Sequence, residues 1–303
     1  NYTNAFSLEW KPIKGLVLRS EATIGLTWKD QYRFYGALTS EGQKNNSQPV
    51  ANIQKDYTFK YIWTNTASYG FTLKNVHNIS LLLGQEIYHS QNTKNVQKNR
   101  YFPRAFEADQ AWANMGFGTP QESYTQLSTP DRTASFFGQA SYNYNHKYLL
   151  SLTMRADGSS KYQNKWGYFP SVGAAWVMSD ENFFKKQHAI DYLKVRASWG
   201  QLGNDHVSAS DGFASITTGT SASGVFGNTT LPGFQNTSYF SWLGWEKVEE
   251  FNAGVNFALL DSRLNVDVDY YNRITKNAVI STTLPFSTQT LAGNNGEIRN
   301  SGF

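Results

Sequence analysis

The sequence predicts an all-β protein, more specifically part of an antiparallel transmembrane β-barrel with about ten strands. Segment after segment alternates apolar with polar residues, which is the period of two of a strand with two different faces. The connections between these segments are short in some places and long in others, as in outer-membrane barrels. Aromatic residues reach 16% while charged residues are only 17%, and barrels place many aromatic side chains at the membrane interfaces.

The alternation defines ten strands, which we name by residue range. They cover residues 2–10, 16–29, 59–71, 79–87, 134–144, 148–157, 168–178, 193–200, 251–259 and 264–271. The clearest of them is the second, which is also long for a globular strand. Its apolar face comprises Leu16, Leu18, Ala22, Ile24, Leu26 and Trp28. Such a face would aggregate in water, so the pattern disfavours a soluble sandwich.

The connections fall into two classes. Short turns are expected at residues 11–15, 74–78, 145–147 and 260–263, and long polar loops at 30–56, 89–131 and 204–245. We interpret the first class as periplasmic turns and the second as extracellular loops. The pattern further predicts a brief helix within 105–115, one helical turn within 180–192, and a loop from Lys276 onward with one more strand near the end.

Tryptophan placement agrees with a membrane barrel. Trp10 and Trp176 fall near the short-turn end of their strands, whereas Trp28, Trp166 and Trp199 fall near the long-loop end. These positions predict two interfacial belts. The alternative is that the rings fill the core of a soluble sandwich.

Composition excludes several classes of protein. The chain contains no cysteine, which rules out disulfides and thiolate metal sites. The net charge is +4, but Lys and Arg are scattered without a basic helix or stripe, so no nucleic-acid partner is expected. No segment approaches the ~20 apolar residues of a membrane helix, so strands must do any spanning.

The stretch from Tyr148 to Asn204 organises the rest. Tyr148, Leu150, Leu152 and Met154 alternate with polar residues that include Arg155. The following strand contains Pro170, which cannot donate to a ladder and therefore predicts an edge, a bulge or an end position.

This stretch carries a family resemblance. The segments RADGSSKY, WGYFPSVGAAW and LKVRASWGQLGN occur in this order between Arg155 and Asn204. They resemble the TonB-dependent outer-membrane receptors of the starch-utilisation (SusC/RagA-like) type, and the similarity continues through 244–280 and 294–303. The sequence departs from that pattern at Trp199, Gln201 and Leu202, where a tyrosine and a threonine-glycine step are expected, but the face pattern survives.

The resemblance implies a barrel of about 22 strands around an N-terminal plug. It also implies TonB-driven import of a large nutrient, either an oligosaccharide or a peptide, across the bacterial outer membrane. The implied partners are a SusD-like surface lipoprotein, TonB and outer-membrane lipid. We expect residues 1–303 to form part of this single barrel domain, with the plug, the TonB box and any signal peptide outside the sequence. A passive porin or autotransporter-type barrel and a soluble all-β carbohydrate-binding module remain as alternatives.

The longest loop offers the candidate substrate-binding residues. Aromatic rings there could stack on sugars or grip peptide side chains, and polar groups could orient the ligand. The candidates are Tyr101, Phe102, Arg104, Asp109, Trp112 and Tyr124. The alternative role for them is packing among the loops.

No enzyme and no cofactor are predicted. The histidines lack the spacing of a metal site, and no nucleophile with an adjacent base is readable. Asp267 and Asp269 share one face of a strand, where they, like Arg155 and Arg196, would line a water-filled interior.

Overall fold

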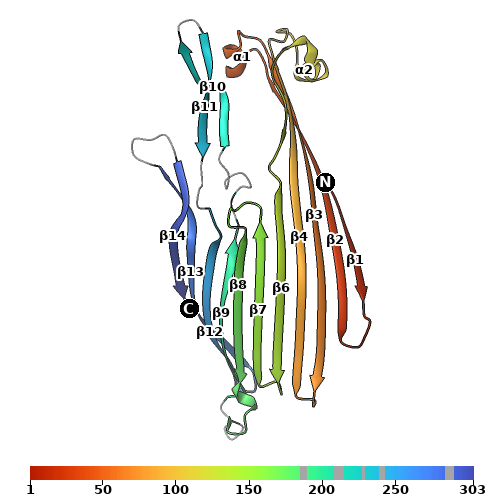
Figure 1. The fold of residues 1–303 in the computed structure, drawn as a ribbon, viewed down its shortest axis with the longest axis vertical. Helices are drawn as coiled ribbons and strands as arrows, with labels where there is room; N and C mark the ends of the chain where they lie inside the picture. The colour runs from red at the N-terminus through yellow and green to blue at the C-terminus, as the bar shows by residue number, and fades with distance from the viewer. Residues whose placement is uncertain (185–189, 206, 208–214, 227–228, 239–242, 284–289) are drawn as a thin grey trace. The chain divides into compact units, whose positions relative to one another are not determined.

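The computed structural model describes the chain except residues 185–189, 206, 208–214, 227–228, 239–242 and 284–289. The described chain is almost entirely β-structure (Figure 1). A 12-stranded sheet has the order β1-β2-β3-β4-β6-β7-β8-β9-β12-β13-β14 with β5 paired to β4, and β10 and β11 form a separate hairpin. Neighbours in the list are also neighbours along the chain, apart from the insertions of β5 and of the hairpin, so the sheet is a meander.

The strands are bounded as follows. They are β1 Tyr2–Trp10, β2 Leu16–Tyr35, β3 Val50–Leu73, β4 His77–Arg100, β5 Thr119–Leu127, β6 Asp131–Tyr144, β7 Tyr148–Ser159, β8 Trp166–Val177, β9 Tyr192–Asn204, β10 Ser215–Phe226, β11 Thr229–Ser238, β12 Glu246–Leu259, β13 Leu264–Thr283 and β14 Thr290–Gly302. The short helices are α1 Ser40–Lys44, α2 Ala108–Ala113, and the 3₁₀ turns η1 Met115–Phe117 and η2 Met178–Asp180. Among the described residues, no helix is long and apolar enough to cross a bilayer.

The chain divides into two compact units. The first comprises Asn1–Phe6, Ala22–Ile62 and Tyr88–Asp131, and the second comprises Ser7–Glu21, Trp63–Ile87 and Arg132–Phe303. The first contains α1, α2 and β5, and the second contains β7 to β14. Strands β1 to β4 each contribute residues to both units, and β6 contributes only its first residue, Asp131, to the first unit. That the chain forms a single barrel domain remains a prediction.

The ten predicted strands are all present, but the number and several lengths are wrong. Residues 30–56 are not one loop, because β2 continues to Tyr35 and β3 begins at Val50. Residues 89–131 include the end of β4 and all of β5, and the predicted brief helix within them is confirmed as α2. The segment 204–245 contains the β10–β11 hairpin, and the tail from Lys276 is mainly strand. The strand predicted near the end is β14. Of the range 180–192, where one helical turn is predicted, η2 includes only Asp180. The N–H of Phe184 donates to the carbonyl of Glu181 at 3.0 Å, and residues 185–189 lie outside the described residues.

The short turns are where the sequence places them. In the second unit they lie together at one end of the strands (Figure 1). Asn145 and His146 have φ of 47° and 58°, the left-handed pair that a tight hairpin turn requires, and the His146 N–H donates to Asn143 Oδ1 at 2.9 Å. Asparagine tolerates this region better than most residues, so the Asn-His pair explains the turn.

The two faces of the sheet have an inverted exposure relative to a soluble protein. On β7, Leu150, Leu152 and Met154 are 40%, 48% and 46% exposed. Asp157, on the opposite face, is buried, and Arg155 is only partly exposed. The apolar face therefore points outward without a protein partner among the described residues, while charged groups gather on the other face.

Pro170 lies at the end of a ladder, as predicted. The β8–β9 pairing runs from Ser171 opposite Gly200 to Val177 opposite Lys194, and Pro170 is the next residue beyond its last pair. Its other neighbour is Met154 of β7. The missing N–H of proline therefore falls where β8 parts from β9.

A compact aromatic cluster forms at this point. Tyr162, Phe169, Leu243 and Trp245 are buried together in the second unit. A β-carbon added to Gly203 would lie 2.1 Å from Cζ of Phe169, so only glycine allows this ring its position. The cluster fixes the connections that precede β8 and β12.

Candidate functional site

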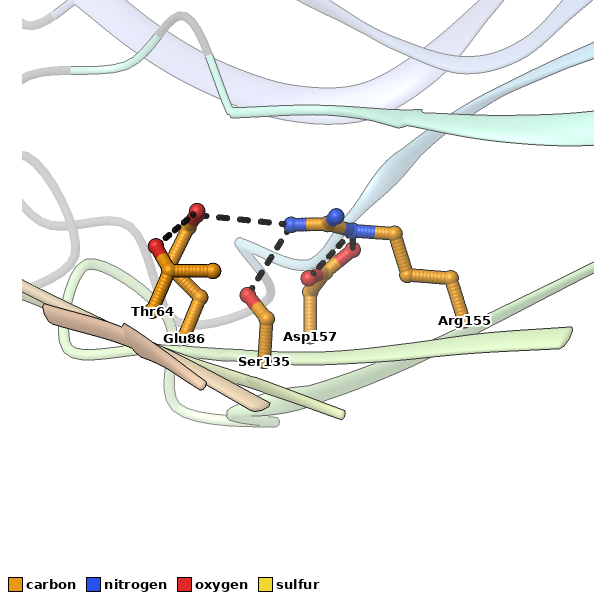
Figure 2. Close-up of polar contacts among 5 residues, drawn as sticks. All are labelled: Thr64, Glu86, Ser135, Arg155 and Asp157. Atoms are coloured by element: carbon orange, nitrogen blue, oxygen red, sulfur yellow. Dashed lines mark hydrogen bonds and ion pairs between the residues drawn. The ribbon is translucent and has the colours of Figure 1, made fainter. Parts of the chain in front are cut away.

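A polar network joins four strands in the second unit (Figure 2). The Arg155 guanidinium donates through Nε to both carboxylate oxygens of Asp157, at 2.8 and 2.9 Å, and through Nη2 to Ser135 Oγ at 3.1 Å. Its Nη2 also lies 3.9 Å from Oε1 of Glu86, whose other oxygen accepts from Thr64 Oγ1 at 3.1 Å. The network thus ties β3, β4, β6 and β7 together on the charged face.

The network contains one more carboxylate than cations. Two carboxylates share one guanidinium, which also lies 5.5 Å from the ring centroid of Phe137. The Asp157 side chain is 11% exposed and the Arg155 side chain 39%, so the pair is protected from water on the carboxylate side only. Charge-assisted contacts of this kind fix side-chain orientation. In this network the contacts produce a rigid polar surface and do not form a reactive group.

A second pair lies on the same kind of face between β9, β12 and β13. Arg196 Nη2 lies 2.7 Å from Asp269 Oδ2, and both side chains approach Gly254 so closely that a β-carbon there would collide with them. Asp267 accepts a hydrogen bond from Asn256. The prediction that these aspartates lie on the polar face is confirmed, and each has a partner.

Sequence reasoning identified Arg155, Arg196 and Asp269 but missed Thr64 and Glu86. Both missed residues occupy polar positions in the period-two pattern of β3 and β4. Their polar positions in that pattern predict that both side chains lie on the polar face. The pattern could not show which residues from separate hairpins meet.

The six predicted substrate-binding residues all lie in the first unit. Phe102 is fully buried, in a cluster with Ala51, Ala111 and Met115. Trp112 packs against the same cluster, and its indole donates to the carbonyl of Arg33 at 3.3 Å. Phe102 therefore has no surface to offer a ligand and instead holds the segment in place.

The other four candidates are exposed. Tyr101 has a left-handed φ of 59° and is 46% exposed, and Tyr124 of β5 is 42% exposed. Arg104 donates to the carbonyl of Asn46 at 3.4 Å, and Asp109 lies in the first turn of α2. Their role in binding stays a prediction.

The face on which Trp112 packs is informative. Its ring lies 5.5 Å from that of Tyr32 and 6.5 Å from that of Phe34. Both residues share the parity of Leu26 and Trp28 along β2, which is the apolar face. Helix α2 therefore covers the continuation of the apolar face, not the face that carries the polar groups.

Two titratable groups outside the strands have displaced pKa values. A hydrogen bond from Tyr148 and another from Lys147 hold the pKa of the Glu181 carboxyl below its usual range; the contacts are 2.7 and 3.1 Å. Burial raises the pKa of Tyr162, whose hydroxyl donates to the carbonyl of Asn204 at 3.1 Å. Both groups act as structural links at the ends of the strands.

The described residues contain no group of three or more His, Asp or Glu side chains that could hold a metal ion.

Comparison with known proteins gives one consistent result. The family described as "TonB dependent receptor-like, beta-barrel" matches residues 1–303. TonB-dependent receptor P3 of Formosa agariphila is 30% identical over 92% of this chain and 28% of its own length. TonB-dependent receptor SusC of Bacteroides thetaiotaomicron is 30% identical over 68% of this chain and 22% of its own length.

Solved structures show the same fold. The RagAB peptide transporter superposes with a TM-score of 0.82 at 20% identity, over 99% of this chain and 33% of the other. The ferripyoverdine receptor of Pseudomonas aeruginosa superposes with a TM-score of 0.53 at 15% identity, over 98% of this chain and 36% of that one. The chain thus spans less than a third of the length of these two curated relatives and about a third of the length of these two solved structures.

Proposed function

Because the chain belongs to the TonB-dependent receptor family, as a stretch of its β-barrel, we propose that it forms wall and outer loops of a receptor that actively imports a large nutrient. The strands lie in the bacterial outer membrane, where the barrels of this family reside. The family consists of receptors and transporters, and we propose that this chain catalyses no reaction. Transport here consists of binding, followed by passage along the polar face.

The observation that carries the proposal is the inverted sheet. An exposed apolar face with a charged opposite face is stable only when lipid covers the first and water or protein covers the second. The Arg155 network and the Arg196–Asp269 pair then line the barrel interior. A soluble binding module would have to bury Leu152 and Met154, which are exposed.

The proposed substrate is an oligosaccharide or a peptide. The resemblance to the starch-utilisation receptors supports the first class, and the fold similarity to the RagAB peptide transporter supports the second. We propose that the exposed candidates Tyr101, Arg104, Asp109 and Tyr124 contact such a ligand, whereas Trp112 packs against Tyr32 and Phe34 of β2. The aromatic rings suit both sugars and peptide side chains.

The proposed partners are TonB, acting through a plug, and a SusD-like surface lipoprotein. Membership of the TonB-dependent receptor family supports the first partner, and the resemblance to the starch-utilisation receptors supports the second. TonB would supply the work of import, and the lipoprotein would deliver the nutrient at the extracellular side.

Uptake in cells tests the proposal. Isotope-labelled glycan and peptide mixtures are offered to the parental strain, to a receptor deletion and to a TonB deletion. We expect one labelled class to enter only when receptor and TonB are both present. Entry that needs the receptor but not TonB would identify a passive porin and refute active import.

A further inference from the structure

The apolar face of the second unit is not uniform. A groove of about 550 Å³ runs across it. On β6 it passes over Gly138 and Ala140, between leucines of β4 and Leu152 and Met154 of β7. Its lining continues to Pro170 and Val172 on β8 and Trp199 on β9. We call this feature the Gly138 groove. On β6, small residues between longer ones leave a hollow on the lipid-facing side.

The groove depends on one glycine. A β-carbon at Gly138 would lie 3.2 Å from Cδ2 of Leu83, so even alanine would begin to close the groove. Gly138 pairs with Met154 and Ala140 with Leu152, so the longer residues of β7 lie in register with the small ones of β6.

A cation lies at the head of the same strand. Arg132 shares the parity of Phe136 and Gly138 and therefore belongs to the apolar face. Its backbone is fixed by Ser160, since its N–H donates to Ser160 Oγ at 2.9 Å and its carbonyl accepts from Ser160 N–H at 2.8 Å. The Arg132 side chain is exposed and forms no ion pair with any carboxylate that the structure describes.

An aromatic platform lies between the cation and the groove. The rings of Phe136 and Trp166 stack, with centroids 6.2 Å apart and planes inclined by 29°. Gly158 of β7, the partner of Trp166, makes room for the indole, because a β-carbon there would lie 3.1 Å from it. Aromatic rings at this level mark the membrane interface.

The spacing matches a membrane lipid. Gly138 follows Arg132 by six positions, or about 20 Å along a strand at ~3.3 Å per residue. A tilt of about 45° reduces this to a depth of about 14 Å, close to half of a hydrocarbon core that is about 30 Å thick. With Arg132 at the level of the headgroups, the groove lies where the acyl chains of the outer leaflet run.

We propose that Arg132, the Phe136–Trp166 platform and the Gly138 groove form a binding site for a phosphate-bearing lipid of the outer leaflet. The guanidinium would pair with the phosphate, for which its planar donors are well suited. An acyl chain would fill the groove. An exposed arginine that pairs with none of the described carboxylates distinguishes this surface from lipid-facing wall that takes any neighbouring lipid.

Lipid retention by the intact receptor tests the site. The receptor is purified from its own outer membrane in mild detergent, and the retained lipids are counted by native mass spectrometry. The wild type is expected to retain phosphate-bearing lipid in preference to neutral lipid. Arg132→Gln should lower that preference about fivefold, which corresponds to ~1 kcal/mol for one cation at an anionic surface.

A matched pair of variants tests the groove. Gly138→Leu fills the groove and should lose the retained lipid, whereas Ala174→Leu, on the same exposed face but outside the groove, should keep it. Wild-type lipid preference in Arg132→Gln would overturn the proposal. Equal losses of lipid in both leucine variants would also overturn it. So would a Gly138→Leu variant that keeps its lipid but self-associates less than the wild type, because that result would assign the groove to a second copy of the protein.

Discussion

Replacement of Arg155 by methionine tests whether the polar network holds the wall together. Methionine keeps the packing against the ring of Phe137 but removes the charge that Asp157 and Glu86 share. Both carboxylates then remain on the interior face without their cation. Asp157→Asn is the milder change, because Arg155 keeps the more distant Glu86.

The magnitude follows from burial. Loss of one partner of a buried ion pair costs about 3–5 kcal/mol, and loss of an exposed pair costs about 1 kcal/mol or less. Asp157 is 11% exposed but Arg155 is 39% exposed, so solvent screens part of the effect. We expect Arg155→Met to lower the free energy of unfolding by about 2 kcal/mol and Asp157→Asn by about half as much.

The assay is urea unfolding of the intact receptor in lipid vesicles, with the two single variants and their double variant. The double variant should be more stable than the sum of the single losses implies, since it lacks the isolated Asp157 charge. Strictly additive losses would refute the reasoning, as would an Asp157→Asn variant less stable than Arg155→Met.

Three further predictions concern Glu181, Gly203 and Phe102. The hydrogen bond from Tyr148 lowers the pKa of Glu181. Its stabilising effect is therefore complete above the ordinary carboxyl pKa and is lost as pH falls through the lowered value. The difference in unfolding free energy between wild type and Glu181→Gln should shrink between pH 7 and pH 3. Gly203→Ala forces a methyl group against the buried ring of Phe169 and should cost about 1–3 kcal/mol in urea unfolding. Phe102→Ala removes a fully buried ring, at a cost of about 3–5 kcal/mol, and should expose residues 101–118 to limited proteolysis.

Each of these has a control in the same chain. Gly116→Ala meets no atom within 4 Å and should leave stability unchanged. Tyr101→Ala, at an exposed position, should leave the proteolysis pattern unchanged. A pH-independent stability difference for Glu181→Gln would mean that its contacts are not charge-dependent. Equal effects of Gly203→Ala and Gly116→Ala would show that the Phe169 ring moves freely.

The strands that the sequence predicts well are those with lipid on one side and water on the other. Residues 2–10 match β1 in both bounds, and β6, β7 and β8 begin or end within a few residues of the prediction. Here the solvent on one face differs from that on the other, and the side chains alternate accordingly.

The strand residues that the sequence analysis assigned to loops have similar, polar surroundings on both faces. Residues 89–100 are HSQNTKNVQKNR, nearly all polar, yet they continue β4 and pair with β5 from Thr93 opposite Leu127 onward. A ladder needs only backbone groups, so a strand with polar surroundings on both faces leaves no period in the sequence. The same holds for β14, whose Asn-Gly-rich residues pair with β13.

The candidate site was predictable in its chemistry but not in its orientation. Residue type identified Trp112 and Phe102 as loop aromatics, but it could not show on which face of the strands they fold back. The contacts of Trp112 with Tyr32 and Phe34 decide this, since they place it over the apolar face. The strands themselves therefore separate Trp112 from the polar face, and Phe102 is buried in the cluster against which Trp112 packs.

Under the proposed function, the polar face of the same strands in the first unit is the surface that a passing nutrient would meet. It carries hydrogen-bonded amides and hydroxyls, with Thr58 Oγ1 3.1 Å from Asn92 Oδ1 and Gln54 Nε2 2.8 Å from Asp56 Oδ2. Lys60 on this face lies directly over Gly25. Such groups recognise hydroxyls or peptide bonds through short, exchangeable hydrogen bonds, which hold a ligand in place and still release it. A transporter needs that combination more than it needs the tight stacking that buried aromatic rings provide.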